Sequence, residues 1–198
     1  MCKNFFKKWV KLSQRASRGP WRRSVLFVGI DWASIGAAAV VGDSGALVKL
    51  WSWKLMRRKG GPVMRLTEKV SGEVTEHLTA ACMGKYCAEQ LEGPYRVVCE
   101  SQYVQRNARA GLVLARGAGM FVGPFLSRAI ESGTPPGDVV RFMTPGEWRV
   151  KHFGKGKRLT RDQHKIRAIT EAHRLTGLRL SDDEAEAVIM ALVCHNAG

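Results

Sequence analysis

Short apolar runs and longer helical repeats alternate along this chain. Two apolar runs, 25–30 and 95–99, are each followed directly by an acidic residue, Asp31 and Glu100. Short runs of this kind, rich in β-branched residues, are typical of buried strands. Gly42-Asp43-Ser44-Gly45 separates two further runs and predicts a hairpin turn. The expected strands are 25–30, 36–41, 46–55, 95–100 and 139–143.

Apolar residues at helical spacing predict the elements between and after these strands. From Pro62, apolar residues recur every four positions as far as Cys82, which predicts one long helix after a basic loop at 57–61. The other expected helices are 104–118, 124–132, one that starts at Thr144-Pro145, 161–176 and 182–196. The order predicts an α/β fold, with a mixed sheet, antiparallel early strands and helices around it.

Composition narrows the class of protein. The chain has 198 residues, 45% of them hydrophobic, which suits one domain with a proper core. With 32 basic and 17 acidic residues the net charge is +15, which implies a polyanionic partner, most often nucleic acid. No apolar stretch approaches the roughly 18 residues of a membrane span, so no membrane partner is expected. Five scattered cysteines without metal-finger spacing favour a reducing, cytoplasmic compartment.

The first 30 residues hold eight Lys or Arg and no acid. We therefore expect a basic arm or leader over residues 1–23 and one folded domain over 24–198. Three interpretations of the leader stay open: an arm that contacts nucleic acid, an organelle transit peptide and a disordered tail. The arm or tail is favoured over the transit peptide.

Acidic residues far apart in the chain are the candidate chemistry. Asp31 and Glu100 end two strands, and Asp183 and Glu186 open the last helix. Carboxylates at the ends of neighbouring strands, joined by others from a packed helix, can hold divalent metal ions. The segment from Ser181 to Glu184 is also a capping box, which any helix favours. Helical geometry alone would allow Asp182 in place of Asp183.

Five segments in order resemble the RuvC-type Holliday-junction resolvases, which have an RNase H-like fold with a mixed five-stranded sheet. Val28-Gly29-Ile30-Asp31 is similar to the first-strand signature of that family, and Cys99-Glu100-Ser101-Gln102-Tyr103 is similar to its second acidic strand. Asn107–Gly117 resembles the helix that follows, and Gly154-Lys155-Gly156-Lys157 resembles a basic loop. Asp183-Glu184-Ala185-Glu186-Ala187 resembles the closing motif, with Glu186 where an aspartate is usual.

The resemblance implies a homodimeric endonuclease of DNA recombination and repair that nicks four-way DNA junctions in pairs. It implies two Mg²⁺ ions per site, for which Mn²⁺ can substitute, with Asp31 bridging, Glu100 on one ion, and Asp183 and Glu186 on the other. A bacterial or phage-infected cell is the implied host, and a branch-migration partner stays open. The residues expected to bind nucleic acid are Tyr103, Arg106, Arg109, Lys155, Lys157 and Arg158.

Other functions remain open at this point. An RNA-processing YqgF-like nuclease would share the fold and act on RNA or another branched structure. Sugar kinases and actin-like ATPases share a Gly-Ile-Asp first strand, but the second phosphate loop they need is absent from this sequence. A non-catalytic nucleic-acid-binding protein would explain the charge and leave the carboxylates without a role.

Overall fold

The computed structural model describes residues 25–101, 108–156 and 159–197. The expected leader over residues 1–23 therefore lies outside the described residues. Within the described ranges the strands form one seven-stranded sheet in the order β5-β4-β3-β2-β1-β6-β7. The strands are β1 (Leu26–Asp31), β2 (Ile35–Val41), β3 (Leu47–Arg58), β4 (Gly61–Glu68), β5 (Val74–His77), β6 (Tyr95–Glu100) and β7 (Val140–Met143).

The centre of the sheet has the mixed topology that the sequence predicted. β1 runs parallel to β6 and β6 parallel to β7, whereas β2 is antiparallel to both β1 and β3. All five expected strands are present, and the α/β class with a mixed sheet flanked by helices is confirmed. The parallel pairing of β1 and β6 brings their carboxyl ends, at Asp31 and Glu100, to the same edge of the sheet.

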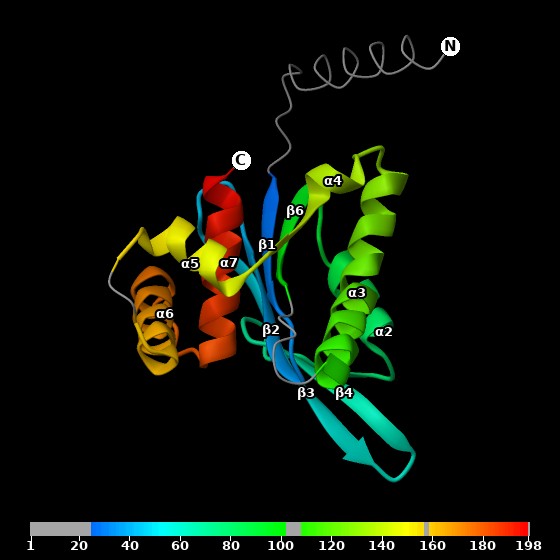
Figure 1. The fold of residues 1–198 in the computed structure, drawn as a ribbon. Coiled ribbons are helices and arrows are strands. Elements are labelled where there is room, and N and C mark those ends of the chain that lie inside the picture. Colours follow the sequence, from blue (N-terminus) through cyan, green and yellow to red (C-terminus); the bar gives the residue numbers. More distant parts are fainter. Residues whose placement is uncertain (1–24, 102–107, 157–158, 198) are drawn as a thin grey trace.

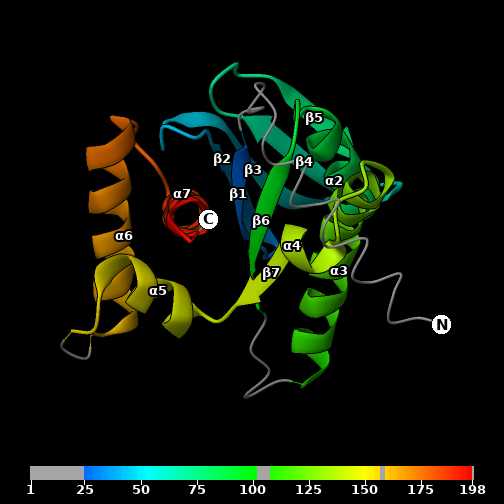
Figure 2. The same cartoon turned by 90° about the horizontal axis from the view of Figure 1, so that it is seen from above.

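Helices cover both faces of the sheet, so the molecule has three layers (Figures 1 and 2). The helices are α2 (Ala80–Glu89), α3 (Ala108–Glu131), α4 (Pro136–Val139), α5 (Pro145–Phe153), α6 (Arg161–Thr176) and α7 (Asp182–Asn196). One hydrophobic core joins the sheet to α2 and α3, and a second joins the opposite face to α5, α6 and α7. The expected helices at 161–176 and 182–196 are confirmed, and α5, α6 and α7 each begin with a capping box.

The expectation of a loop and one long helix over residues 57–82 is wrong. These residues form the end of β3, then β4 and β5, and the start of α2. The sheet therefore has two more strands than the five expected. A four-residue repeat fits a strand as well as a helix, because four is a multiple of the two-residue period of a strand. Met64 and Leu66 are buried while their neighbours face outward, which is strand alternation. Lys59-Gly60 closes a two-residue hairpin turn between Arg58 and Gly61.

The expected helices 104–118 and 124–132 are one continuous helix in the described residues, α3, with Pro124 inside it. Of the glycines that suggested a bend, Gly117 serves a contact, since a Cβ there would lie 2.8 Å from the indole nitrogen of Trp32, whereas a Cβ on Gly119 or Gly123 would meet no atom within 4 Å. As one helix, α3 is long and apolar enough to span a membrane by length and composition. The expectation that no stretch approaches this length is therefore wrong. In the structure α3 packs against α2, and Phe121, Val122 and Phe125 are buried.

Helix α7 packs directly on β1 because Gly29 has no side chain. A Cβ on Gly29 would lie 2.2 Å from the carbonyl oxygen of Ala187 and 2.3 Å from the amide nitrogen of Ala191. α5 and α6 cover the other side of α7, so every residue from Glu184 to Cys194 is buried. This packing places the first turns of α7 against the end of β1 that carries Asp31.

Candidate active site

Three carboxylates from three elements meet at the carboxyl ends of β1 and β6. One carboxylate oxygen each from Asp31, Glu100 and Glu186 lies within 4.8 Å of the other two. Asp31 and Glu186 are each 7% exposed, and Glu100 is partly buried. The sequence named all three residues, and the parallel strands and the close contact of α7 with β1 bring them together.

Burial and mutual repulsion disfavour the charged forms of this cluster. Burial raises the pKa of Asp31 well above its usual value, and the charges of Glu100 and Glu186 raise it further. Burial also raises the pKa of Glu100, although a hydrogen bond from Trp148 opposes this shift. Buried carboxylates with raised pKa values are frequent at functional sites, because catalysis and ion binding use groups whose pKa is shifted by burial and by neighbouring charges.

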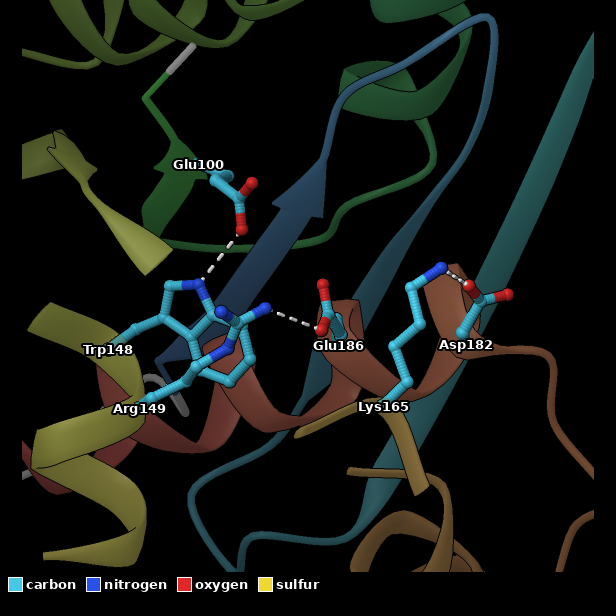
Figure 3. Close-up of polar contacts among 6 residues, drawn as sticks. All are labelled: Glu100, Trp148, Arg149, Lys165, Asp182 and Glu186. Carbon is cyan, nitrogen blue, oxygen red and sulfur yellow. Dashed lines mark hydrogen bonds and ion pairs between the residues drawn. The ribbon is translucent and has the colours of Figure 1, made fainter. Parts of the chain in front are cut away.

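Two residues of α5, which the sequence interpretation missed, hold two of these carboxylates (Figure 3). The indole Nε1 of Trp148 donates a 2.9 Å hydrogen bond to Oε2 of Glu100. The guanidinium of Arg149 donates a 2.9 Å hydrogen bond to Oε1 of Glu186 and stacks over the Trp148 ring at 4.8 Å. The capping box at Thr144 predicts the start of α5. No local pattern indicates that its next turn faces acids on β6 and α7.

The remaining acids at the start of α7 have separate environments. Asp182 accepts a hydrogen bond from Lys165 of α6, which lowers the pKa of Asp182 (Figure 3). Glu184 is buried, caps the helix through the Ser181 amide and forms an ion pair with Lys69 at 2.9 Å.

Asp183 lies outside the group of three carboxylates, so the structure does not bring together all four predicted ligands. Burial and the neighbouring charge of Asp182 raise the pKa of Asp183. Its charge is also among the smaller causes that raise the pKa of Asp31, which places Asp183 near the cluster. Its role as a ligand stays a prediction.

The residues predicted to bind nucleic acid are only partly described. Tyr103, Arg106, Lys157 and Arg158 lie outside the described residues. Arg109 is exposed in the first turn of α3, and Lys155 is exposed in the segment between α5 and α6. The exposure leaves both side chains accessible to a ligand, and their binding role stays a prediction.

The donor set fits a hard divalent cation. Mg²⁺ and Ca²⁺ prefer oxygen ligands, at about 2.1 Å and about 2.3–2.6 Å respectively. Two oxygens on opposite sides of one ion are therefore roughly 4.2 Å apart for Mg²⁺ and up to about 5 Å apart for Ca²⁺. The separations of at most 4.8 Å among the three carboxylates suit such an ion after small side-chain movements. The only cation bonded to them in the described residues is Arg149, which leaves a net negative charge.

Comparison with known proteins gives similar folds. No protein-family model matches the sequence, and no curated protein does. The chain is similar to a solved structure of Thermus thermophilus RuvC, with 21% identity over 86% of this chain and 92% of that one and a TM-score of 0.48. It is also similar to T. thermophilus RuvC in complex with a Holliday junction substrate, with 18% identity over 85% and 91% and a TM-score of 0.47. Neither likeness bears on a phage origin.

Proposed function

We propose that this protein is a metal-dependent endonuclease that cuts branched DNA at four-way junctions. The observation that carries the proposal is the meeting of Asp31, Glu100 and Glu186 at one edge of the sheet. A buried group of carboxylates is unfavourable without a cation, and a chain of charge +15 suits a polyanionic substrate. The choice of a four-way junction, with paired nicking by a homodimer, follows from the sequence motifs.

Asp31 would hold a Mg²⁺ or Mn²⁺ ion together with Glu100, and Glu186 would share a second ion with Asp183. Bound divalent ions supply charge stabilisation at the phosphate and activation of the attacking water. The protein's own residues fix the ligands. Trp148 orients Glu100 through its N–H, and the first two turns of α7 carry Asp183 and Glu186 three residues apart, which makes them neighbours on the helix surface.

Arg149 has two roles in this proposal. Its guanidinium neutralises part of the carboxylate charge in the metal-free protein through its bond to Glu186. Because an arginine keeps its positive charge at any pH relevant to the cell, it also lowers the repulsion between the site and an approaching phosphate. The positive charge of Arg149 also stabilises the ionised form of Glu100, because it lowers the pKa of that carboxyl group.

The test compares cleavage of four labelled DNAs: a four-way junction, a fork, a duplex and a single strand. Each is incubated with purified protein in Mg²⁺, Mn²⁺ or EDTA, beside an RNA junction of matched sequence. We expect cleavage of the DNA junction that requires the metal, with nicks in two opposite strands. Preferred cleavage of the RNA junction would favour an RNA-processing nuclease of the same fold, and metal-independent cleavage would refute the proposed site.

Two variants separate binding from cutting. Asp31→Asn and Glu100→Gln remove a charged ligand but leave the basic surface unchanged, so junction binding should persist while cleavage falls by orders of magnitude. Glu73→Gln is the matched control, because Glu73 is an exposed acid outside the cluster. Wild-type cutting by the Asp31 or Glu100 variant would exclude the assignment of the metal site.

A further inference from the structure

The hairpin formed by β3 and β4 extends past the rest of the sheet at the edge that carries the carboxylates. β2 begins at Ile35, which pairs with Lys54, and β1 ends at Asp31, which pairs with Ala37. Beyond this level β3 continues to Arg58. At about 3.4 Å per residue, the four residues after Lys54 reach roughly 14 Å farther. Figure 1 shows this hairpin projecting beyond the ends of the neighbouring strands.

Residues 54–65, which we name the basic hairpin, carry five Lys or Arg and no acid. All five side chains are exposed: Lys54, Arg57, Arg58, Lys59 and Arg65. Arg58 forms an ion pair with Glu76 of β5. In the described part of the chain no ion pair joins any of the other four to an acid.

Two of these cations face each other across the two strands. Lys54 and Arg65 are direct partners in the β3–β4 register. Like charges at directly opposite positions are destabilising, so this pair works against the stability of the hairpin. A polyanion bound between the two side chains would remove the repulsion.

The same pair lies on the face of the sheet that carries the carboxylates. Leu50 belongs to the core shared with α7, and strand alternation puts Lys54, four residues later, on that same face. In β1, Gly29 faces α7, which puts Asp31 on this face as well. A ligand strand that reaches Asp31 from outside therefore has Lys54 and Arg65 beside its path.

We propose that the basic hairpin binds the phosphate backbone of the nucleic acid that reaches the carboxylate site, an inference that rests on the proposed nuclease function. Lys54 and Arg65 lie at one level of the hairpin, and Arg57 and Lys59 lie farther along it toward the turn, so exposed cations follow its length. A nucleic acid offers such a surface one negative charge for every 3.4 Å of each strand. The hairpin thereby adds contacts to a duplex arm next to the cleaved strand. Such contacts strengthen binding to any sequence, because they read no bases.

The first experiment measures binding without cleavage, in EDTA, by fluorescence anisotropy of a labelled four-way junction and a labelled duplex at several salt concentrations. Each phosphate contact contributes roughly 0.9 to the slope of log affinity against log salt. Lys54→Ala with Arg65→Ala should lower that slope by about 2 and weaken binding roughly tenfold at low salt. An unchanged slope and affinity would overturn the proposal.

The matched control removes two other exposed cations, Lys85→Ala with Arg96→Ala. Lys85 is on α2, on the opposite side of the sheet, and Arg96 is at the start of β6, at the end far from Glu100. The control should keep the wild-type slope. If it weakens binding as much as the hairpin variant does, overall charge accounts for the effect and the hairpin assignment is wrong.

A charge reversal separates binding from structure. Lys54→Glu creates an opposite-charge pair with Arg65, so we expect a higher Tm together with weaker DNA binding. Wild-type affinity in this variant would contradict the proposal. None of these measurements uses cleavage. A wild-type protein that binds DNA but does not cut it would refute the nuclease function, and the binding measurements would still test the hairpin assignment independently.

Discussion

The contact between Gly29 and α7 can be tested by adding one methyl group. In Gly29→Ala the new Cβ would lie 2.2 Å from the Ala187 oxygen and 2.3 Å from the Ala191 nitrogen, and both are backbone atoms. No side chain can rotate to relieve the clash. To restore an ordinary separation of about 3.4 Å, α7 has to move away from β1 by roughly 1 Å.

This displacement has two expected effects. Overpacking of a well-packed core costs about 1–3 kcal/mol, and for a chain of this size 1 kcal/mol corresponds to roughly 2–4 °C in Tm. We therefore expect Tm to fall by about 2–12 °C. Because Glu186 precedes Ala187 in the chain, it moves with α7 and away from Asp31, so the stabilisation produced by Mg²⁺ or Mn²⁺ should shrink as well.

The assay is thermal unfolding followed by circular dichroism, in EDTA and at increasing Mn²⁺ concentration. Gly123→Ala is the control: no heavy atom lies within 4 Å of the added Cβ, and alanine favours a helix over glycine by about 1 kcal/mol. The control should unfold at or above the wild-type Tm with the same metal-induced shift. If Gly29→Ala gives wild-type Tm values with and without Mn²⁺, the direct packing of α7 on β1 is not what positions Glu186.

Three further predictions concern the carboxylates. The pKa of Asp31 is raised in the folded protein, so its carboxyl group stabilises the metal-free protein fully at pH values below its usual pKa of 3.8 and loses this contribution as the pH rises through the raised pKa. In EDTA, the Tm of Asp31→Asn should therefore increase relative to the wild-type Tm between pH 4 and pH 8. A Tm difference that does not change with pH would contradict this. Trp148→Phe should weaken Mn²⁺ binding measured by calorimetry, whereas Trp51→Phe should not, since the Trp51 indole N–H has no hydrogen-bond partner among the described residues. Equal effects of the two substitutions would exclude a positioning role for Trp148. Asp183→Asn should abolish junction cleavage and Asp182→Asn should retain it, because Lys165 holds Asp182; the reverse result would move the ligand register by one residue.

Local sequence patterns determined most of the secondary structure. Apolar runs located β1 and β6, and the residues at Thr144-Pro145 and Ser181–Glu184 located the starts of α5 and α7, because both signals act within a few residues of the chain. The pattern was ambiguous over 57–82, where a four-residue spacing suits either period. Pairing with β3 decided in favour of strands there, and that pairing is a long-range interaction that the spacing does not contain.

For the site, the sequence by itself identified four candidate acids, Asp31, Glu100, Asp183 and Glu186, because they stand at or near the ends of elements where side chains converge. Only the tertiary structure decided which of them meet, because that depends on how closely α7 approaches β1 at Gly29. It also brought Trp148 and Arg149 to Glu100 and Glu186, across separations of 48 and 37 residues. Contacts over such distances depend on the packing of whole elements, and no local periodicity records them.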